Sequence, residues 1–215
     1  MHNFNTYPSV FLLSILTFLI FPISSNSQTS NIDPAPGPRS DHCVFAYNSG
    51  FYVFGGVGNV NEGNDNYSYF SYIKAPFNVT DPKWTSLPVA KATKVSRPAC
   101  SVTSDGILYV TGGDPSDNKY AGIQSFNLEK GQSGTWDTPP KTRGLNTSQY
   151  LSHRRGHKSI VVKTSSEEVL FIFGGSGSKS NDALILNVKN SNWETVPKGV
   201  SVQNSNRMRL ITLDP

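Results

Sequence analysis

The sequence predicts an all-β protein built from a repeated four-stranded unit. A run of apolar, β-branched and aromatic residues that stops at a glycine pair occurs three times, over residues 51–56, 107–113 and 169–175. Counted between the first glycines, the pairs stand 57 and 62 residues apart, a period that indicates a repeated supersecondary unit. The only three tryptophans of the chain fall one per repeat, at Trp84, Trp136 and Trp193.

Each apolar run is typical of a strand buried on both faces, and the glycine pair beyond it allows a turn with positive φ. The paired glycines are Gly55, Gly56, Gly112, Gly113, Gly174 and Gly175. A further strand precedes each pair, and arginine marks its start. The marking residues are Arg39, Arg97, and Arg154 with Arg155.

Taken in order, the expected strands form three sets of four. The first set covers residues 42–47, 51–55, 67–73 and 83–87. The second covers 99–104, 107–112, 122–128 and 134–138, and the third covers 157–163, 168–174, 182–188 and 192–196. Helical periodicity is absent, and glycine and proline are frequent between the strands. Residues 207–213 are expected to open a fourth set.

An arginine-led strand, a strand ending in Gly-Gly, a third strand and a tryptophan-led fourth strand resemble the kelch repeat, over residues 39–196. A kelch repeat forms one four-stranded blade of a β-propeller. The segment from Ser71 to Phe77, with Trp84, is also similar to secreted fungal kelch proteins described as galactose oxidase-like. The resemblance implies a kelch-type β-propeller of about three blades plus the start of a fourth, which is an incomplete ring.

This interpretation divides the chain into consecutive segments. They are a signal peptide at 1–27, a proline-rich lead-in at 28–38, blades at 39–90, 91–140 and 141–199, and the start of the next blade at 200–215. Propellers usually close with about 4 to 8 blades. Three explanations therefore stay open: a fragment of a longer protein, self-association that completes a ring, or a stable half-array.

The amino-terminal segment is expected to be a secretion signal. Residues 1–27 contain no Lys, Arg, Asp or Glu, and residues 10–21 form an almost unbroken apolar run. That run is shorter than the about 20 residues of a transmembrane helix and fits the core of a signal peptide. Small residues before Gln28 fit a cleavage site. An uncleaved membrane anchor over residues 10–23 and a buried strand are the alternatives.

The formal charge of +4 lies beyond residue 27 and is spread along the chain. This mild, dispersed charge predicts neither a nucleic-acid partner nor a membrane surface. We therefore expect a secreted protein whose partner is a protein or a glycan.

Residues that open the innermost strands are the candidate ligand-binding residues. In kelch proteins this strand lines the central channel, so the resemblance implies a polar, partly cationic funnel. The alternative is a structural role, in which the side chains donate hydrogen bonds to loop carbonyls between blades. The residues are Arg39, His42, Arg97, Arg154 and His157, and Ala99 is taken to stand where the other repeats have histidine.

His153 and His157 are four residues apart, a spacing that could ligate a metal on a helix. Here the spacing falls in a loop that enters a strand, beside cations that repel a metal ion, so no metal site is expected. A positively charged rim that attracts an anionic glycan or an acidic protein patch is the remaining hypothesis.

Cys43 and Cys100 each stand 12 residues before a glycine pair, which predicts equivalent positions on neighbouring blades. Secretion permits a disulfide, but equivalent residues of neighbouring blades usually stand further apart than the about 7 Å between Cα atoms that a disulfide tolerates. Two buried free thiols are therefore expected. Secretion would also expose N-glycosylation sequons, whose alternative is ordinary turn asparagine. The sequon residues are Asn66, Asn78 and Asn146.

The sequence contains no motif that predicts catalysis. It has no nucleophile elbow with a Ser-His-Asp order, no phosphate-binding glycine loop before a helix, and no paired carboxylates. We therefore predict a non-catalytic, secreted binding module for protein or glycan, without a cofactor. The alternatives are half of a galactose oxidase-like copper enzyme, whose copper-ligand motifs find no match here, and a nonfunctional fragment of a longer kelch protein.

Overall fold

The computed structural model describes residues 36–58, 69–78, 80–116, 122–137, 143–163, 165–177 and 183–195. The chain divides into two compact units, Met1–Asn31 and Ile32–Pro215, and all described residues belong to the second. The expected signal segment, the Asn66 sequon and the strand expected at 207–213 lie outside the described residues. Among the helices within the described ranges, none has the length and apolar character needed to cross a membrane.

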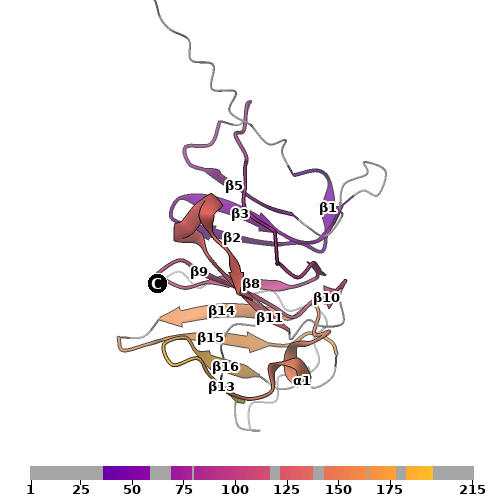
Figure 1. Ribbon diagram of the computed structural model, residues 1–215, viewed down its shortest axis with the longest axis vertical. Coiled ribbons are helices and arrows are strands. Elements are labelled where there is room, and N and C mark those ends of the chain that lie inside the picture. Colours follow the sequence, from indigo (N-terminus) through magenta and orange to yellow (C-terminus); the bar gives the residue numbers. More distant parts are fainter. Residues whose placement is uncertain are drawn as a thin grey trace, which may run out of the picture. The chain divides into compact units, whose positions relative to one another are not determined.

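Within the described residues, each repeat forms one large sheet of four or five strands (Figure 1). Blade 1 contains β2 (Cys43–Tyr47), β3 (Gly50–Phe54), β5 (Phe70–Lys74) and β6 (Thr85–Ser86). Blade 2 contains β8 (Ala99–Val102), β9 (Ile107–Thr111), β11 (Ile123–Asn127) and β12 (Trp136–Asp137). Blade 3 contains β14 (Lys158–Lys163), β15 (Glu168–Phe173), β16 (Leu184–Asn187) and β17 (Asn192–Thr195), with β13 (Arg143–Gly144) parallel to β17. The predicted all-β, four-stranded repeat is confirmed.

A short second ladder closes one end of each blade. β1 (Arg39–Ser40) pairs with β4 (Val57–Gly58), and β7 (Val95–Ser96) pairs with β10 (Asp114–Pro115). In blade 3 a bridge between Arg155 and Ser176 takes the same place. In every blade, the segment before the innermost strand thus pairs with the residues just beyond the glycine pair. We call this end of the blades the glycine edge, which comprises the glycine pairs and the lead-in segments 39–42, 95–98 and 154–157.

Strand register aligns the three repeats residue by residue. The residues directly before the glycine pairs are Phe54, Thr111 and Phe173. Their partners on the innermost strands are Cys43, Ala99 and Lys158. The residues one step earlier, His42, Pro98 and His157, are therefore equivalent. The expectation that Ala99 replaces a histidine is wrong, because Pro98 holds that position.

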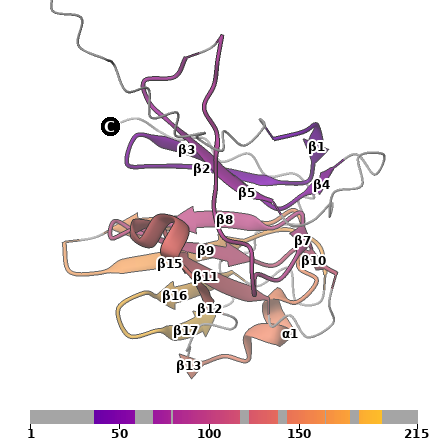
Figure 2. The same cartoon turned by 45° about the horizontal axis from the view of Figure 1, so that its top comes forward.

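The sheets pack face to face in sequence order (Figure 2). We call the face of a blade toward the preceding blade its upstream face, and the other its downstream face. Between blades 1 and 2, Trp136 lies against Phe54 and Phe70, with ring centroids 4.9 and 5.5 Å apart. Between blades 2 and 3 a second apolar cluster joins Tyr109 and Ile123 to residues of β15, β16 and β17. Each interface buries large side chains from both sheets, and this burial is the main favourable term that holds the blades together.

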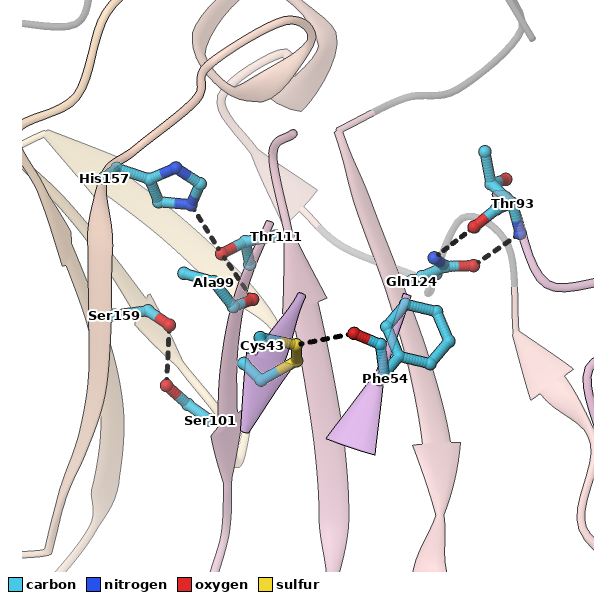
Figure 3. Close-up of a disulfide and its surroundings, with 10 residues drawn as sticks. Cys43, Phe54, Thr93, Ala99, Ser101, Thr111, Gln124, His157 and Ser159 are labelled. Carbon is cyan, nitrogen blue, oxygen red and sulfur yellow. Dashed lines mark hydrogen bonds between the residues drawn. A yellow bond between two sulfur atoms is a disulfide. The ribbon is translucent and has the colours of Figure 1, made fainter. Parts of the chain in front are cut away.

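Cys43 and Cys100 form a disulfide between β2 and β8, with their Cα atoms 5.8 Å apart (Figure 3). The expectation of two free thiols is wrong. The cysteines are not equivalent, because Cys43 pairs with Phe54 while Cys100 pairs with Val110, one residue further from its glycine pair. Successive side chains on a strand point to opposite faces. The offset therefore turns Cys43 toward blade 2 and Cys100 back toward blade 1.

Two short helices interrupt the β structure of the described residues, although the sequence shows no helical periodicity. They are the 3-10 helix η2 (Leu128–Ser133) and the α-helix α1 (Thr147–Leu151). The side chain of Asn146 caps α1 by accepting a hydrogen bond from the Ser148 N–H at 3.2 Å. Leu151 at the end of α1 is completely buried and contacts Gly122. The buried leucine and the asparagine cap together stabilise this single helical turn.

Candidate functional site

The glycine pairs set how closely chain segments approach at the glycine edge. Both glycines have positive φ in every pair, between 57° and 96°. A Cβ on Gly112 would lie 2.3 Å from the carbonyl oxygen of Arg154, which belongs to the following blade. A Cβ on Gly56 would lie 2.5 Å from the carbonyl oxygen of Ser40, in the lead-in of its own blade. The first glycine therefore makes room for the next blade, and the second makes room for its own lead-in.

Two backbone hydrogen bonds join each blade to the next at this edge, and we call them the inter-blade lock. The first runs from the second glycine to a lead-in carbonyl of the following blade: Gly56 N to Val95 O at 3.2 Å, and Gly113 N to Arg154 O at 2.6 Å. The second joins successive lead-ins: Arg97 N to Asp41 O at 2.7 Å, and Gly156 N to Arg97 O at 3.5 Å. The lock fixes the positions of the residues that border it.

Arg39 and Arg154 occupy equivalent positions, and their side chains donate hydrogen bonds to backbone carbonyls of the glycine edge. Arg39 Nη1 donates to Gly55 O at 2.8 Å, and Arg154 Nε donates to Gly174 O at 2.9 Å. The Arg39 guanidinium also lies 3.9 Å from the centroid of the Tyr69 ring. Burial lowers the pKa of Arg39. Arg154 is completely buried. Both arginines thus donate to a glycine carbonyl of their own blade.

His157 is buried between blades 2 and 3 (Figure 3). Its Nε2 lies 3.0 Å from Thr111 Oγ1, and that hydroxyl lies 3.4 Å from the Ala99 carbonyl oxygen, to which it can donate. Burial, with the positive charges of Arg154 and Lys158, lowers the pKa of His157 to about 3. The imidazole is therefore neutral near pH 7.

The other two described histidines lie in different surroundings. His42, the equivalent of His157, is exposed, and His153 is exposed in the loop before blade 3. Among the described residues there is no group of three or more His, Cys, Asp and Glu side chains that could hold a metal ion. The histidines named by the sequence are therefore not gathered into one site.

One charged cluster on the glycine edge is open to solvent. Arg97 Nη2 and Asp114 Oδ2 form an ion pair, and Arg155 Nη1 donates to Asp114 Oδ1 at 3.2 Å. The side chains of Arg97 and Arg155 are 44% and 47% exposed. Arg97 and Asp114 come from blade 2 and Arg155 comes from blade 3, so the cluster spans an inter-blade junction. We call these three residues the arginine cluster.

The arginine cluster carries a net positive charge, because two guanidinium groups share one carboxylate. Each guanidinium has five N–H donors in a fork geometry that matches a carboxylate. Contacts to Asp114 use only part of that capacity. Backbone bonds on both sides hold the cluster: Arg97 belongs to the inter-blade lock, and Arg155 exchanges backbone bonds with Ser176 at 3.0 and 2.9 Å. The arrangement holds two guanidinium groups in place, and their geometry suits a planar anionic group.

Two members of the cluster, Asp114 and Arg155, are absent from the candidate ligand residues named by the sequence. A signal for each is present in the chain. Asp114 is the residue directly beyond a glycine pair, where blades 1 and 3 have Val57 and Ser176. Arg154 and Arg155 are adjacent on an extended segment, so their side chains point in opposite directions and one of them can be exposed.

A second polar hollow lies at the opposite ends of the blade 1 strands. It has a volume of about 230 Å³ and is lined by Tyr47, Tyr52, Tyr72 and Glu129, among others. Tyr47 donates to Glu129 at 2.6 Å, and this hydrogen bond raises the pKa of Tyr47 to about 12. Tyr52 is stacked on Tyr72 on one side and on Phe45 on the other. Because both faces of the Tyr52 ring are already covered, that ring offers no stacking platform for a sugar.

Four-stranded blades joined through glycine pairs define this molecule as part of a kelch-type β-propeller. Residues 14–211 match the family model described as the KLHDC2/KLHL20/DRC7 Kelch-repeats domain. That match covers far more than half of the 215 residues, so the chain belongs to this family of kelch-repeat domains. Kelch domains typically mediate protein–protein interactions. No curated protein matches the chain.

Proposed function

We propose that the chain is a non-catalytic protein-binding module that recognises an acidic segment of its partner through the arginine cluster. One observation carries the proposal: two half-exposed guanidinium groups from neighbouring blades converge on the single carboxylate of Asp114. An acidic side chain of a partner can take up the donors that Asp114 leaves unused. Family membership supports a protein partner in general.

Carboxylate recognition fits the cluster better than recognition of a neutral glycan. Arginine forms paired, charge-assisted hydrogen bonds with planar carboxylates. Neutral sugars are bound instead through exposed aromatic faces and neutral hydrogen bonds, and the tyrosine hollow of blade 1 offers a ring whose faces are already stacked. An anionic glycan shares the carboxylate chemistry and is the alternative ligand.

Absence of catalysis is part of the proposal, and the perturbed groups support it. His157, whose pKa is strongly lowered, is buried against Thr111, and Tyr47, whose pKa is raised, is bonded to Glu129. Both shifts follow from structural contacts. The copper-oxidase alternative and the galactose oxidase-like label rest on the sequence resemblance alone, and they would require copper ligands outside the candidate residues named above.

We also propose that the protein is secreted. The apolar run at residues 10–21 and the disulfide between Cys43 and Cys100 support an oxidising destination. Asn78 and Asn146 are exposed, and each side-chain oxygen accepts a hydrogen bond from the hydroxyl two residues on, at 2.8 and 2.6 Å. Glycosylation at the amide nitrogen would leave both acceptors in place. Mass spectrometry of the chain from a secretory host should show cleavage before Gln28 and loss of mass with peptide N-glycosidase. A cell-associated chain that keeps residues 10–23 would support the membrane-anchor alternative.

Fluorescence anisotropy with a labelled hexaglutamate peptide tests the acidic-segment proposal. We expect binding by the full chain and a roughly tenfold or greater loss of affinity in the Arg97→Gln/Arg155→Gln double variant. Arg143→Gln is the matched control, because Arg143 is exposed but lies outside the cluster. Binding should weaken as salt is raised, since the contacts are charged and exposed.

Either of two results would overturn the acidic-segment proposal. One is equal affinity for the double variant and the Arg143→Gln control, which would place the peptide outside the arginine cluster. The other is the absence of hexaglutamate binding together with binding of a sulfated oligosaccharide, which would favour the glycan alternative.

A further inference from the structure

Part of the upstream face of blade 1, around Phe51, is exposed, although Val53 on the same face is 4% exposed. Phe51 occupies the register position of Leu108 and Leu170. Leu108 and Leu170 are 0% exposed, whereas Phe51 is 39% exposed. Trp84 is likewise only partly buried, whereas its counterparts Trp136 and Trp193 are buried beneath the preceding blade. Within the described residues, no sheet covers this face.

A groove of about 570 Å³ lies on this face near the β2–β3 turn. Its lining is almost wholly apolar and includes Ala46, Phe51, Ile73, Phe77 and Pro82. Val44 on the same face is 48% exposed. An exposed apolar groove of this kind is typical of a protein interface.

The downstream face of blade 3 carries partly exposed apolar side chains that could pack against the groove of blade 1. Phe171 and Phe173 stand at the register positions of Tyr52 and Phe54, with their ring centroids 5.5 Å apart. In blade 1, Tyr52 and Phe54 are buried against blade 2, where Phe54 contacts Trp136. Phe171 and Phe173 are less completely buried, and Val162 on the same face is 43% exposed.

The two ends also carry the two halves of the inter-blade lock. Gly175 is equivalent to Gly56 and Gly113, whose N–H groups donate to the following blade. Among the described residues, no backbone carbonyl accepts a hydrogen bond from the Gly175 N–H. Arg39 is equivalent to Val95 and Arg154, whose carbonyls accept that bond in the other two blades. Blade 3 thus carries a backbone donor of the lock, the Gly175 N–H, and blade 1 carries a backbone acceptor, the Arg39 carbonyl.

We propose that two copies of this chain complete one propeller. The downstream face of blade 3 of each copy packs on the upstream face of blade 1 of the other, with Gly175 N donating to Arg39 O across each junction. Three blades from each copy give six, within the usual range of about 4 to 8. A head-to-tail contact that occurs twice around a twofold axis closes without leaving a free end. The arginine cluster lies between blades 2 and 3, so it stays exposed in the ring.

Multi-angle light scattering on the full chain, after removal of N-glycans, measures the predicted state directly. Glycan removal keeps sugar mass out of the measured value. Asn78 lies at the border of the groove, so the ring requires that a glycan on Asn78 extend away from the junction. We expect a mass twice that of one chain at micromolar concentration. A single-chain mass at every concentration tested would overturn the proposal and would favour completion by further blades of a longer protein. It would leave the acidic-segment proposal intact, because hexaglutamate binding does not require the ring.

A charge-pair experiment separates a specific junction from misfolding. Phe51→Lys and Val162→Glu each place a charge on one half of the junction, at positions that are already 39% and 43% exposed. Each variant alone should be monomeric, with a dimer dissociation constant roughly 100-fold or more above that of the unchanged chain. An equimolar mixture should recover a dimer, because one junction then pairs Lys with Glu and the other is unchanged. Dimers that persist in both single variants, or a mixture that stays monomeric, would overturn the arrangement.

Discussion

The two glycines of each pair face different neighbours, and this decides what a substitution costs. Gly112 faces Arg154 of the following blade and also the ring of His157, whose Cε1 would lie 2.4 Å from a Cβ. Neither obstacle can withdraw easily, because the Arg154 carbonyl belongs to the inter-blade lock and His157 is buried. Gly131 also has positive φ, but a Cβ there would meet nothing within 4 Å.

Gly112→Ala should therefore cost more than Gly131→Ala. Backbone strain alone predicts a loss of about 1–3 kcal/mol at Gly131. The clash at Gly112 should add at least about 2 kcal/mol. Chemical denaturation of the two variants measures the difference. Equal losses of unfolding free energy in the two variants would show that blades 2 and 3 move apart at Gly112 with little energetic cost.

The buried imidazole of His157 predicts a loss of stability in acid. Its pKa is lowered from 6.5 to about 3, so between these values the unfolded chain binds a proton that the folded chain does not. The neutral imidazole of His157 makes its full contribution to the free energy of unfolding above pH 6.5. This contribution is lost as the pH falls toward 3. At pH 5 the expected loss is about 2 kcal/mol relative to neutral pH.

Unfolding free energies at pH 7.5 and 5 measure this effect in three chains. The unchanged chain and His42→Gln should show the full loss, because His42 is exposed. His157→Gln should show a smaller loss. Equal pH dependence in all three would contradict the assignment to His157.

Among the strands and blades, the tryptophans show how much one element depends on its neighbour. Trp136 is 4% exposed and contacts aromatic rings of blade 1, whereas Trp84 is partly exposed and contacts Phe51 of its own blade, with ring centroids 6.5 Å apart. Trp136→Ala should cost about 3–5 kcal/mol. Trp84→Ala should cost clearly less in a single copy. Thermal melts in dilute solution test both, and similar losses would mean that Trp84 is covered in the isolated chain.

Strand positions could be predicted closely because they follow from local pattern. Apolar runs, glycine pairs and tryptophans locate nearly every strand of the three sheets. The disulfide could not be predicted, because its register depends on hairpin length. The Tyr47–Gly50 pair closes the blade 1 hairpin, and the Val102–Leu108 pair closes the blade 2 hairpin. The blade 2 hairpin is therefore one residue longer between its innermost strand and its glycine pair. That residue moves Cys100 to the face opposite to the one that counting predicts.

Only part of the candidate site could be predicted. The arginines that precede the innermost strands are visible in the sequence, but their roles depend on which side of an extended segment they occupy. Arg154 is buried and Arg155 is exposed, although they are adjacent. Asp114 is drawn into the cluster by the β7–β10 ladder, which is too short to leave a pattern in the sequence.

For the molecule as a whole, the proposed ring predicts that stability depends on protein concentration. Association that occurs only in the folded state stabilises that state by mass action. The melting temperature of the unchanged chain should therefore rise as its concentration rises from micromolar upward. That of Phe51→Lys should stay constant, and differential scanning calorimetry measures both. A constant melting temperature in the unchanged chain would contradict the ring.

The inter-blade lock also bears on how such a chain can change in length. Every repeat carries both a donor glycine and an acceptor lead-in, so the junction made by one repeat does not depend on the identity of the next. A gene that gains or loses one whole repeat creates no junction of a new kind. A gene that gains or loses part of a repeat separates a donor from its acceptor. Descendants of this sequence should therefore differ by whole repeats, with breakpoints that keep each glycine pair together with its own lead-in.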